Sequence, residues 1–179
     1  DGGNGSDTYQ VTGNQAGGWS SFAGFDTYAD TGAAGSDRIV ATGADVDIGL
    51  RSFSATNGIE VIDASGATGT TRLLGDSSND TLDLRGVTLA GNIVIDGAYG
   101  NDVLYGNNAD NTLRGGGGND TMDGGNGSDT YQVTGNQAGG WSSFAGFDTY
   151  ADTGAAGSDR IVATGADVDI GLRLSLIHI

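Results

Sequence analysis

Apolar residues are distributed along the chain in short runs, and glycine, asparagine, aspartate and serine separate these runs. Within a run, apolar and polar residues often alternate, as they do in a strand whose side chains point to opposite faces. No stretch combines helical spacing of apolar positions with capping residues. The pattern therefore predicts an all-β protein of short strands joined by turns. Outside the block described next, the expected strands are 38–42, 46–53, 59–63, 72–74, 81–84 and 93–95.

The pattern is most regular over residues 97–132, which divide into four nine-residue units reading GAYGNDVLY, GNNADNTLR, GGGGNDTMD and GGNGSDTYQ. Glycines at positions one, two and four of a unit allow a sharp turn with positive φ. The last three positions form a short strand, and the apolar residue at position eight is expected to point inward. Each unit is therefore predicted to be a turn followed by a three-residue strand. The position-eight residues are Leu104, Leu113, Met122 and Tyr131.

The turns of these units offer oxygen atoms to a cation. Backbone carbonyls converge in such a turn, position six adds a short carboxylate or amide, and Ca²⁺ takes about six to eight oxygen ligands. A degenerate unit at 75–83 and a further unit at 2–10 extend the set. The candidate metal ligands are Asp102, Asp120, Asp129, Asp80, Asp7 and Asn111, with the turn residues Gly97, Gly100, Gly116, Gly118, Gly125 and Gly127.

Units 115–123 and 124–132 match G-G-x-G-x-D-x-U-x, with U a large apolar residue, at every specified position. The block therefore resembles the RTX, or hemolysin-type, calcium-binding repeat. The resemblance implies a right-handed parallel β-roll in which two units make one coil, turns 18 residues apart stack, and calcium is bound between stacked turns. Asp102 would then pair with Asp120, and Asn111 with Asp129. The second site is expected to be weaker, because Asn111 carries no charge.

The turn at 2–7 has the same sequence as the turn at 124–129, but no turn precedes it. Because a site needs oxygens from two stacked turns, we expect Asp7 to be a poorer ligand than Asp129.

A second, longer repeat organises the whole chain, because residues 1–51 recur without change at 123–173. We expect a truncated end of a nonapeptide block at 1–10, an irregular parallel β-solenoid at 11–96, the β-roll block at 97–132 and a second irregular section at 133–173. The sequence is thus interpreted as a fragment of a larger tandem-repeat protein. Residues 174–179, LSLIHI, depart from the repeat and resemble a translated sequencing adapter, so His178 is given no role.

The composition narrows the possible functions. The chain carries 23 acidic and 7 basic residues, a net charge of −16, and no cysteine. Phosphate binding needs clustered basic residues, so nucleic acid is not expected as a partner. No run reaches the length of a membrane span, and no catalytic motif is found, so neither membrane insertion nor enzyme activity is expected.

These observations and the resemblance together predict a calcium-binding structural repeat of a large secreted or cell-surface bacterial protein that folds on extracellular Ca²⁺, with an adhesin-like stalk as the first interpretation. The resemblance implies export by type I secretion. The alternatives are the calcium-binding region of an RTX protease or lipase and, less favoured, an ice-binding repeat using Thr112 and Thr130 on one face and Thr121 on the other. The expected partners are calcium ions and neighbouring repeats. Segment 13–32 carries aromatic residues that could contact a glycan or cell-surface ligand, although we expect them to pack onto the solenoid.

Overall fold

The computed structural model describes residues 1–13, 25–32, 35–134, 146–165, 168 and 170–174. In this part of the chain the only helix is a single 3-10 turn, η1 (Ala55–Asn57), and every strand pair is parallel. The predicted all-β parallel roll is therefore confirmed. None of the described helical residues forms a segment long and apolar enough to cross a membrane.

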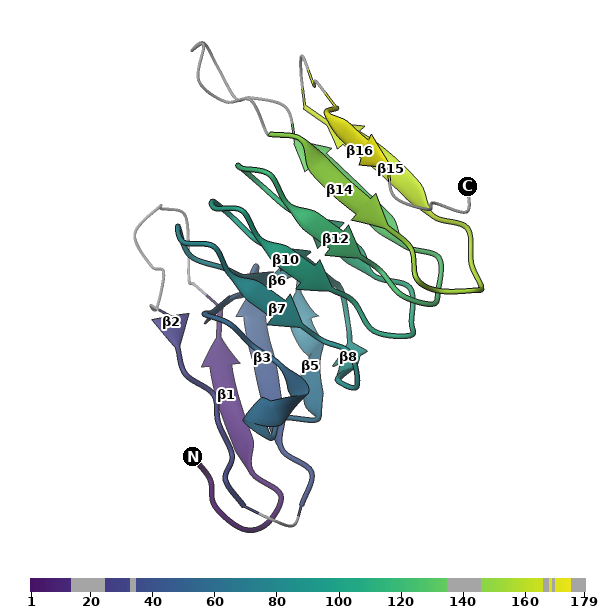
Figure 1. Ribbon diagram of the computed structural model, residues 1–179. Coiled ribbons are helices and arrows are strands. Elements are labelled where there is room, and N and C mark those ends of the chain that lie inside the picture. Colours follow the sequence, from purple (N-terminus) through teal and green to yellow (C-terminus); the bar gives the residue numbers. More distant parts are fainter. Residues whose placement is uncertain (14–24, 33–34, 135–145, 166–167, 169, 175–179) are drawn as a thin grey trace.

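The strands form three sheets, of which the second runs along the molecule, the first lies toward the N-terminal end and the third toward the C-terminal end (Figure 1). The first sheet contains, in order, β1 (Thr8–Thr12), β3 (Arg38–Ala44), β5 (Val61–Thr68) and β8 (Thr88–Ala90). The second contains β2 (Phe25–Asp26), β4 (Asp47–Leu50), β6 (Thr71–Leu74), β9 (Ile93–Asp96), β11 (Thr112–Arg114), β13 (Thr130–Thr134) and β15 (Arg160–Thr164). The third contains β7 (Thr81–Asp83), β10 (Val103–Tyr105), β12 (Thr121–Asp123), β14 (Asp148–Ala151) and β16 (Leu172–Leu174).

The coils change from three sides to two along the chain. From β5 to β10 successive strands visit the first, second and third sheets in turn, and the first sheet ends at β8. From β11 onward the strands alternate between the second and third sheets only. Within the nonapeptide block coil length accounts for the loss of the third side: stacked residues are 22 apart where β7 pairs with β10, but 18 apart where β10 pairs with β12. A nine-residue unit holds one turn and one short strand, which leaves no residues for a third side.

The core is a set of apolar files running through these coils. Position-eight residues of the block are almost fully buried, with 0% to 3% of their surface exposed, so their inward orientation is confirmed. In the third sheet the file is Leu82, Leu104, Met122 and Tyr150, each in register with the next. In the second sheet Leu73, Ile95, Leu113 and Tyr131 form the corresponding file. Parallel stacking thus places like residues on like residues and makes one continuous core.

Several expectations need correction. Strands β2, β8 and β14 were not expected, and the strand expected over 46–53 is shorter, at Asp47–Leu50. Of the aromatic residues in 13–32, Tyr28 is buried and packs edge-on against Tyr9, with ring centroids 5.9 Å apart, as expected for residues that pack onto the solenoid. Trp19 and Phe22 lie outside the described residues, as do residues 175–179 of the expected adapter tail.

Tyr131 ties the two sides of the roll together. Its hydroxyl accepts a hydrogen bond from the Gly124 N–H at 2.9 Å and donates to the Ala151 carbonyl at 2.8 Å. Replacing Tyr131 by phenylalanine leaves both backbone groups without this partner, which costs about 1–3 kcal/mol for a buried group. We expect a lower melting temperature in saturating calcium. Tyr9→Phe is the matched control, because Tyr9 makes the same two contacts in a less buried setting and should lose less. Equal losses would contradict this role of burial.

Candidate metal centre

The position-six residues form ladders along the edges of the roll. The backbone N–H of Asp102 donates to Asp120 Oδ1 at 2.8 Å, and the N–H of Asn111 donates to Asp129 Oδ1 at 2.8 Å. The structure therefore stacks the two pairs of turns that the sequence was expected to stack. The first ladder extends in both directions, because Asp80 N–H donates to Asp102 Oδ1 and Asp120 N–H donates to Asp148 Oδ1.

Three of the ladder carboxylates, Asp102, Asp120 and Asp129, use one oxygen for the neighbouring coil and leave the other without a partner. Asp102, Asp120 and Asp129 are at most 1% exposed, and the Oδ2 atom of each is buried without a hydrogen bond. A buried charged oxygen with no partner is costly, so native proteins pair such groups or place them on metal ions. A cation bound beside these oxygens would give each of them a partner.

The glycine at position one leaves space for an ion beside this oxygen. A Cβ atom added to Gly97 would overlap Asp102 Oδ2 and would lie 2.6 Å from the carbonyl oxygen of Gly115 in the next coil. At Gly106 a Cβ would overlap Asn111 Oδ1 and lie 2.5 Å from the Gly124 carbonyl oxygen. A side-chain oxygen and a carbonyl of the stacked turn thus line the same small space. Carboxylate, amide and carbonyl oxygens are the ligands that a hard cation such as Ca²⁺ takes.

The remaining candidate glycines keep the turns close together. Gly116 and Gly125 at position two have φ values of 101° and 84°, which disfavour a side chain. At position four, a Cβ on Gly118 would overlap the carbonyl oxygen of Gly100, and one on Gly127 would lie 2.6 Å from the carbonyl oxygen of Ala109. These glycines allow backbone carbonyls of successive coils to approach each other. The first two units depart from the rule: Ala98 stands at position two of the first with φ of 70°, and Asn107 and Ala109 stand at positions two and four of the second.

The surroundings of the ladder aspartates disfavour their negative charge. Burial, opposed by a backbone hydrogen bond and reinforced by neighbouring aspartates, raises the pKa of Asp102 and of Asp129 to about 7 and that of Asp120 to about 6. Within the described residues no arginine forms an ion pair with these three. The ion pairs there instead join Arg51 to Asp76, Arg72 to Asp47, Arg85 to Asp83 and Arg114 to Asp96.

These pKa shifts predict how the calcium-free fold depends on pH. In the unfolded chain the ladder aspartates have a pKa near 3.8, whereas burial raises the folded values of Asp102 and Asp129 to about 7. The folded state therefore binds more protons between these values, and its stability falls as pH rises through this window. In calcium-depleted buffer we expect more β-structure by circular dichroism at about pH 5 than at about pH 8. A β-signal that grows with pH would contradict the assignment of these carboxylates as buried and unpaired.

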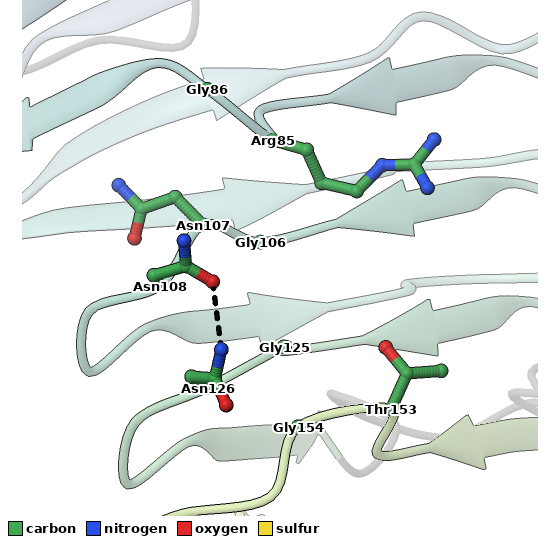
Figure 2. Close-up of a pocket in the computed structure, with 9 residues that line it drawn as sticks. All are labelled: Arg85, Gly86, Gly106, Asn107, Asn108, Gly125, Asn126, Thr153 and Gly154. Atoms are coloured by element: carbon green, nitrogen blue, oxygen red, sulfur yellow. Dashed lines mark hydrogen bonds between the residues drawn. The ribbon is translucent and has the colours of Figure 1, made fainter.

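Asparagine side chains also join successive turns by hydrogen bonds. The Asn101 N–H donates to Asn79 Oδ1 and the Asn119 N–H to Asn101 Oδ1, both at 2.8 Å, so position five forms its own ladder. At position three, Asn126 Nδ2 donates to Asn108 Oδ1 at 3.0 Å beside a small surface pocket of about 120 Å³ (Figure 2). Its lining consists of Arg85, Thr153, asparagines and glycines, and contains no carboxylate, histidine or cysteine. The pocket is a polar groove between turns, with no residue set for catalysis.

The sequence analysis missed three aspartates of the ladders, Asp37, Asp148 and Asp159. Asp148 continues the ladder of Asp120, and Asp159 Oδ1 accepts from the Asp129 N–H at 2.8 Å. A signal was present: residues 32–40 and 154–162 both read GAAGSDRIV, which keeps the glycines at positions one and four, the aspartate at six and an apolar residue at eight. The lost second glycine and the longer spacing to the block concealed them.

The reason for expecting Asp7 to be a poorer ligand than Asp129 needs correction. No turn precedes residues 2–7, but the following coil stacks on them, since the Asp7 N–H donates to Asp37 Oδ1 at 2.6 Å. Asp7 Oδ2 is buried without a partner, like that of Asp129. The argument that Asp7 lacks a second turn is therefore wrong, because it considered only the preceding side.

Comparison with known families agrees with this geometry. Residues 96–131 match four copies of the RTX calcium-binding nonapeptide repeat, which is the block expected at 97–132 with its start moved by one residue. No curated protein and no solved structure matches the chain. The resemblance drawn from the sequence is confirmed, and calcium is the ion bound by repeats of this type.

Proposed function

We propose that this chain, which carries four RTX calcium-binding nonapeptide repeats at residues 96–131, is a calcium-folded structural segment of a secreted or cell-surface protein. The observation that supports it most strongly is the set of buried, partnerless Oδ2 atoms on Asp102, Asp120 and Asp129. Such a chain is a calcium-binding repeat region, and its task is to hold a folded rod wherever calcium is abundant.

The chain's own residues couple folding to the ion. In the unfolded chain the aspartates are separated and solvated, whereas the fold stacks Asp80, Asp102, Asp120 and Asp148 in one ladder. Bound calcium supplies the positive charge that this ladder lacks. Because only the folded state assembles the ladder, calcium shifts the equilibrium toward that state by mass action. Export as an unfolded chain through a type I system, followed by folding outside, is consistent with this coupling and with the absence of cysteine.

An adhesin-like stalk is the role we favour. The duplicated stretch, residues 1–51 and again 123–173, covers irregular coils as well as a nonapeptide unit, and each coil pairs only with its neighbours along the stack (Figure 1). Such quasi-one-dimensional stacking lets a rod be lengthened by adding units. The alternative is that the chain is the calcium-binding region of an RTX protease or lipase. A catalytic domain elsewhere in the parent protein would favour this alternative.

The structure gives little support to ice binding by rows of threonine side chains. Thr112 and Thr130 are in register as expected, but Thr130 is followed by Arg160. On the other face Thr81, Thr121 and Thr149 lie in one file, and Val103 interrupts it between the first two. The second file is longer than the sequence suggested, yet neither file is a continuous row of threonines.

The substitution Asp120→Asn tests the proposed calcium sites, and its control is a second substitution that makes the same change in charge. The amide keeps an acceptor for the Asp102 N–H but removes the charge beside the space at Gly115, so we expect the calcium midpoint for folding to rise about tenfold or more, equivalent to about 1.4 kcal/mol. Asp83→Asn is the control, because Asp83 faces away from the turn and pairs with Arg85, a partly exposed contact of small value. Calcium titrations followed by circular dichroism and calorimetry measure both. Equal shifts would mean that the register of the ligands is wrong.

A further inference from the structure

The turns that precede the strands of the third sheet lie side by side along one edge of the roll (Figure 1). They lead into β7, β10, β12 and β14, and an asparagine at position five joins each turn to the next. Asn79 Oδ1 accepts from the Asn101 N–H, and Asn101 Oδ1 accepts from the Asn119 N–H, both at 2.8 Å. Asn119 Oδ1 in turn accepts from the Phe147 N–H at 2.7 Å. This edge therefore carries a continuous row of three amides.

The amide row presents hydrogen-bond donors to the outside. Each Oδ1 atom accepts from the next turn, whereas the Nδ2 groups of Asn79, Asn101 and Asn119 donate to no acceptor in the described part of the chain. All three side chains are exposed. Each Nδ2 group carries two donors, and successive coils are spaced by about 4.8 Å, the distance between neighbouring strands. The edge thus offers a regular line of donors.

Exposed aromatic side chains flank this row. Tyr99 is 70% exposed and Phe147 is 48% exposed. A Cβ on Gly117 would lie 3.3 Å from Tyr99 Cδ1, and one on Gly171 would lie 3.0 Å from Phe147 Cδ1, so each ring lies beside a glycine of the next turn, which has no side chain to cover it. Ile170, the other exposed large apolar residue in the described ranges, precedes Gly171 on the same edge. The amide–aromatic strip consists of Asn79, Tyr99, Asn101, Asn119 and Phe147.

The amide–aromatic strip is uncharged, although the chain has a net charge of −16. Asp76, in the first of these turns, pairs with Arg51. The opposite edge differs, because position five there includes the exposed Asp110, and Asn126 uses its Nδ2 group on Asn108. The position-six carboxylates of the strip's own turns are at most 5% exposed; they are Asp80, Asp102, Asp120 and Asp148.

We propose that the amide–aromatic strip binds an uncharged saccharide. One face of a sugar ring carries C–H groups that pack on the negative face of an aromatic ring, and its hydroxyl oxygens accept from amide N–H groups. A tyrosine offers a large, rigid contact surface at low cost in conformational entropy. An acidic saccharide would meet no exposed cation in the strip, so an uncharged one fits better. The binding residues differ from the proposed calcium ligands, so this role goes beyond the calcium-folded rod.

The test applies the full chain, in millimolar calcium, to an array of immobilised neutral glucans, galactans, mannans and N-acetylhexosamine oligomers. We expect binding to at least one class, and titration calorimetry with that oligosaccharide then gives the affinity. Tyr99→Ala should weaken binding about tenfold or more. Asn101→Asp should do the same, because it keeps the acceptor for the Asn119 N–H but removes the donors. The controls are Asn126→Asp, the same change on the opposite edge, and Tyr105→Ala, which removes a ring that an arginine covers. Both should bind like the parent.

Absence of binding to every neutral oligosaccharide would overturn the proposal, and so would parent-like binding by Tyr99→Ala or stronger binding to sulfated or uronic-acid oligosaccharides on the same array. Circular dichroism in calcium shows whether each variant is folded, and the exposed Tyr99 should be replaceable without loss of the fold. If Tyr99→Ala did not fold, Tyr99→Leu would take its place, and undiminished binding by that variant would refute the role of the ring. Saccharide binding that persisted in excess chelator would contradict calcium-dependent folding but not the strip.

Discussion

Gly118→Ala is expected to abolish calcium-induced folding even in millimolar calcium. Gly118 has φ of 132°, and a Cβ on it would overlap the carbonyl oxygen of Gly100 in the stacked coil. Relief requires the two coils to move apart, which would break the hydrogen bond from the Asp102 N–H to Asp120 Oδ1 and the strand pairing of β10 with β12. A loss of about 4 kcal/mol or more follows, which is large compared with ordinary single substitutions. Circular dichroism over a calcium titration measures the effect.

The neighbouring residue supplies the control. Gly117 does not have positive φ, and the nearest atom to an added Cβ is Cδ1 of Tyr99, at 3.3 Å. Tyr99 is 70% exposed, so its ring can move aside. Gly117→Ala should therefore fold at nearly the parent's calcium concentration. If both alanine variants fold at the same calcium concentration, then the glycine at position four is not needed for the close approach of the turns.

The nonapeptide block could be predicted because its information is local. Nine residues define one turn and one strand, and an 18-residue coil then fixes which side chains stack. The pairing of Asp102 with Asp120 and the inward file of Leu104 and Met122 follow directly from this period.

The irregular section could not be predicted in the same way, because its coils have different lengths. Stacked positions are 30 residues apart at Asp129 and Asp159 but 28 apart at Asp120 and Asp148, so no single period aligns them. The third side of the coils, and strand β8 within it, depend on which distant segments pair. Asp30 was missed for the same reason: it has no fixed position in a repeat, and only pairing of the coils brings it close to Asp7 and Asp37.

Removal of calcium is expected to have the largest effect of all. The fold buries partnerless carboxylate oxygens on Asp7, Asp102, Asp120 and Asp129. An unpaired buried ion costs several kcal/mol. Four of them together approach or exceed the roughly 5–15 kcal/mol by which domains are usually stable. With no disulfide to hold the chain together, the calcium-free protein should be unfolded at neutral pH.

The most direct test is far-ultraviolet circular dichroism of the full chain at neutral pH, with thermal melting, in excess chelator and again in millimolar calcium. We predict a disordered spectrum without a cooperative melt in chelator, and a β-rich spectrum with a cooperative melt once calcium is restored. A β-rich, cooperatively melting protein in excess chelator would contradict the account, because the fold would then tolerate its buried carboxylates without the ion.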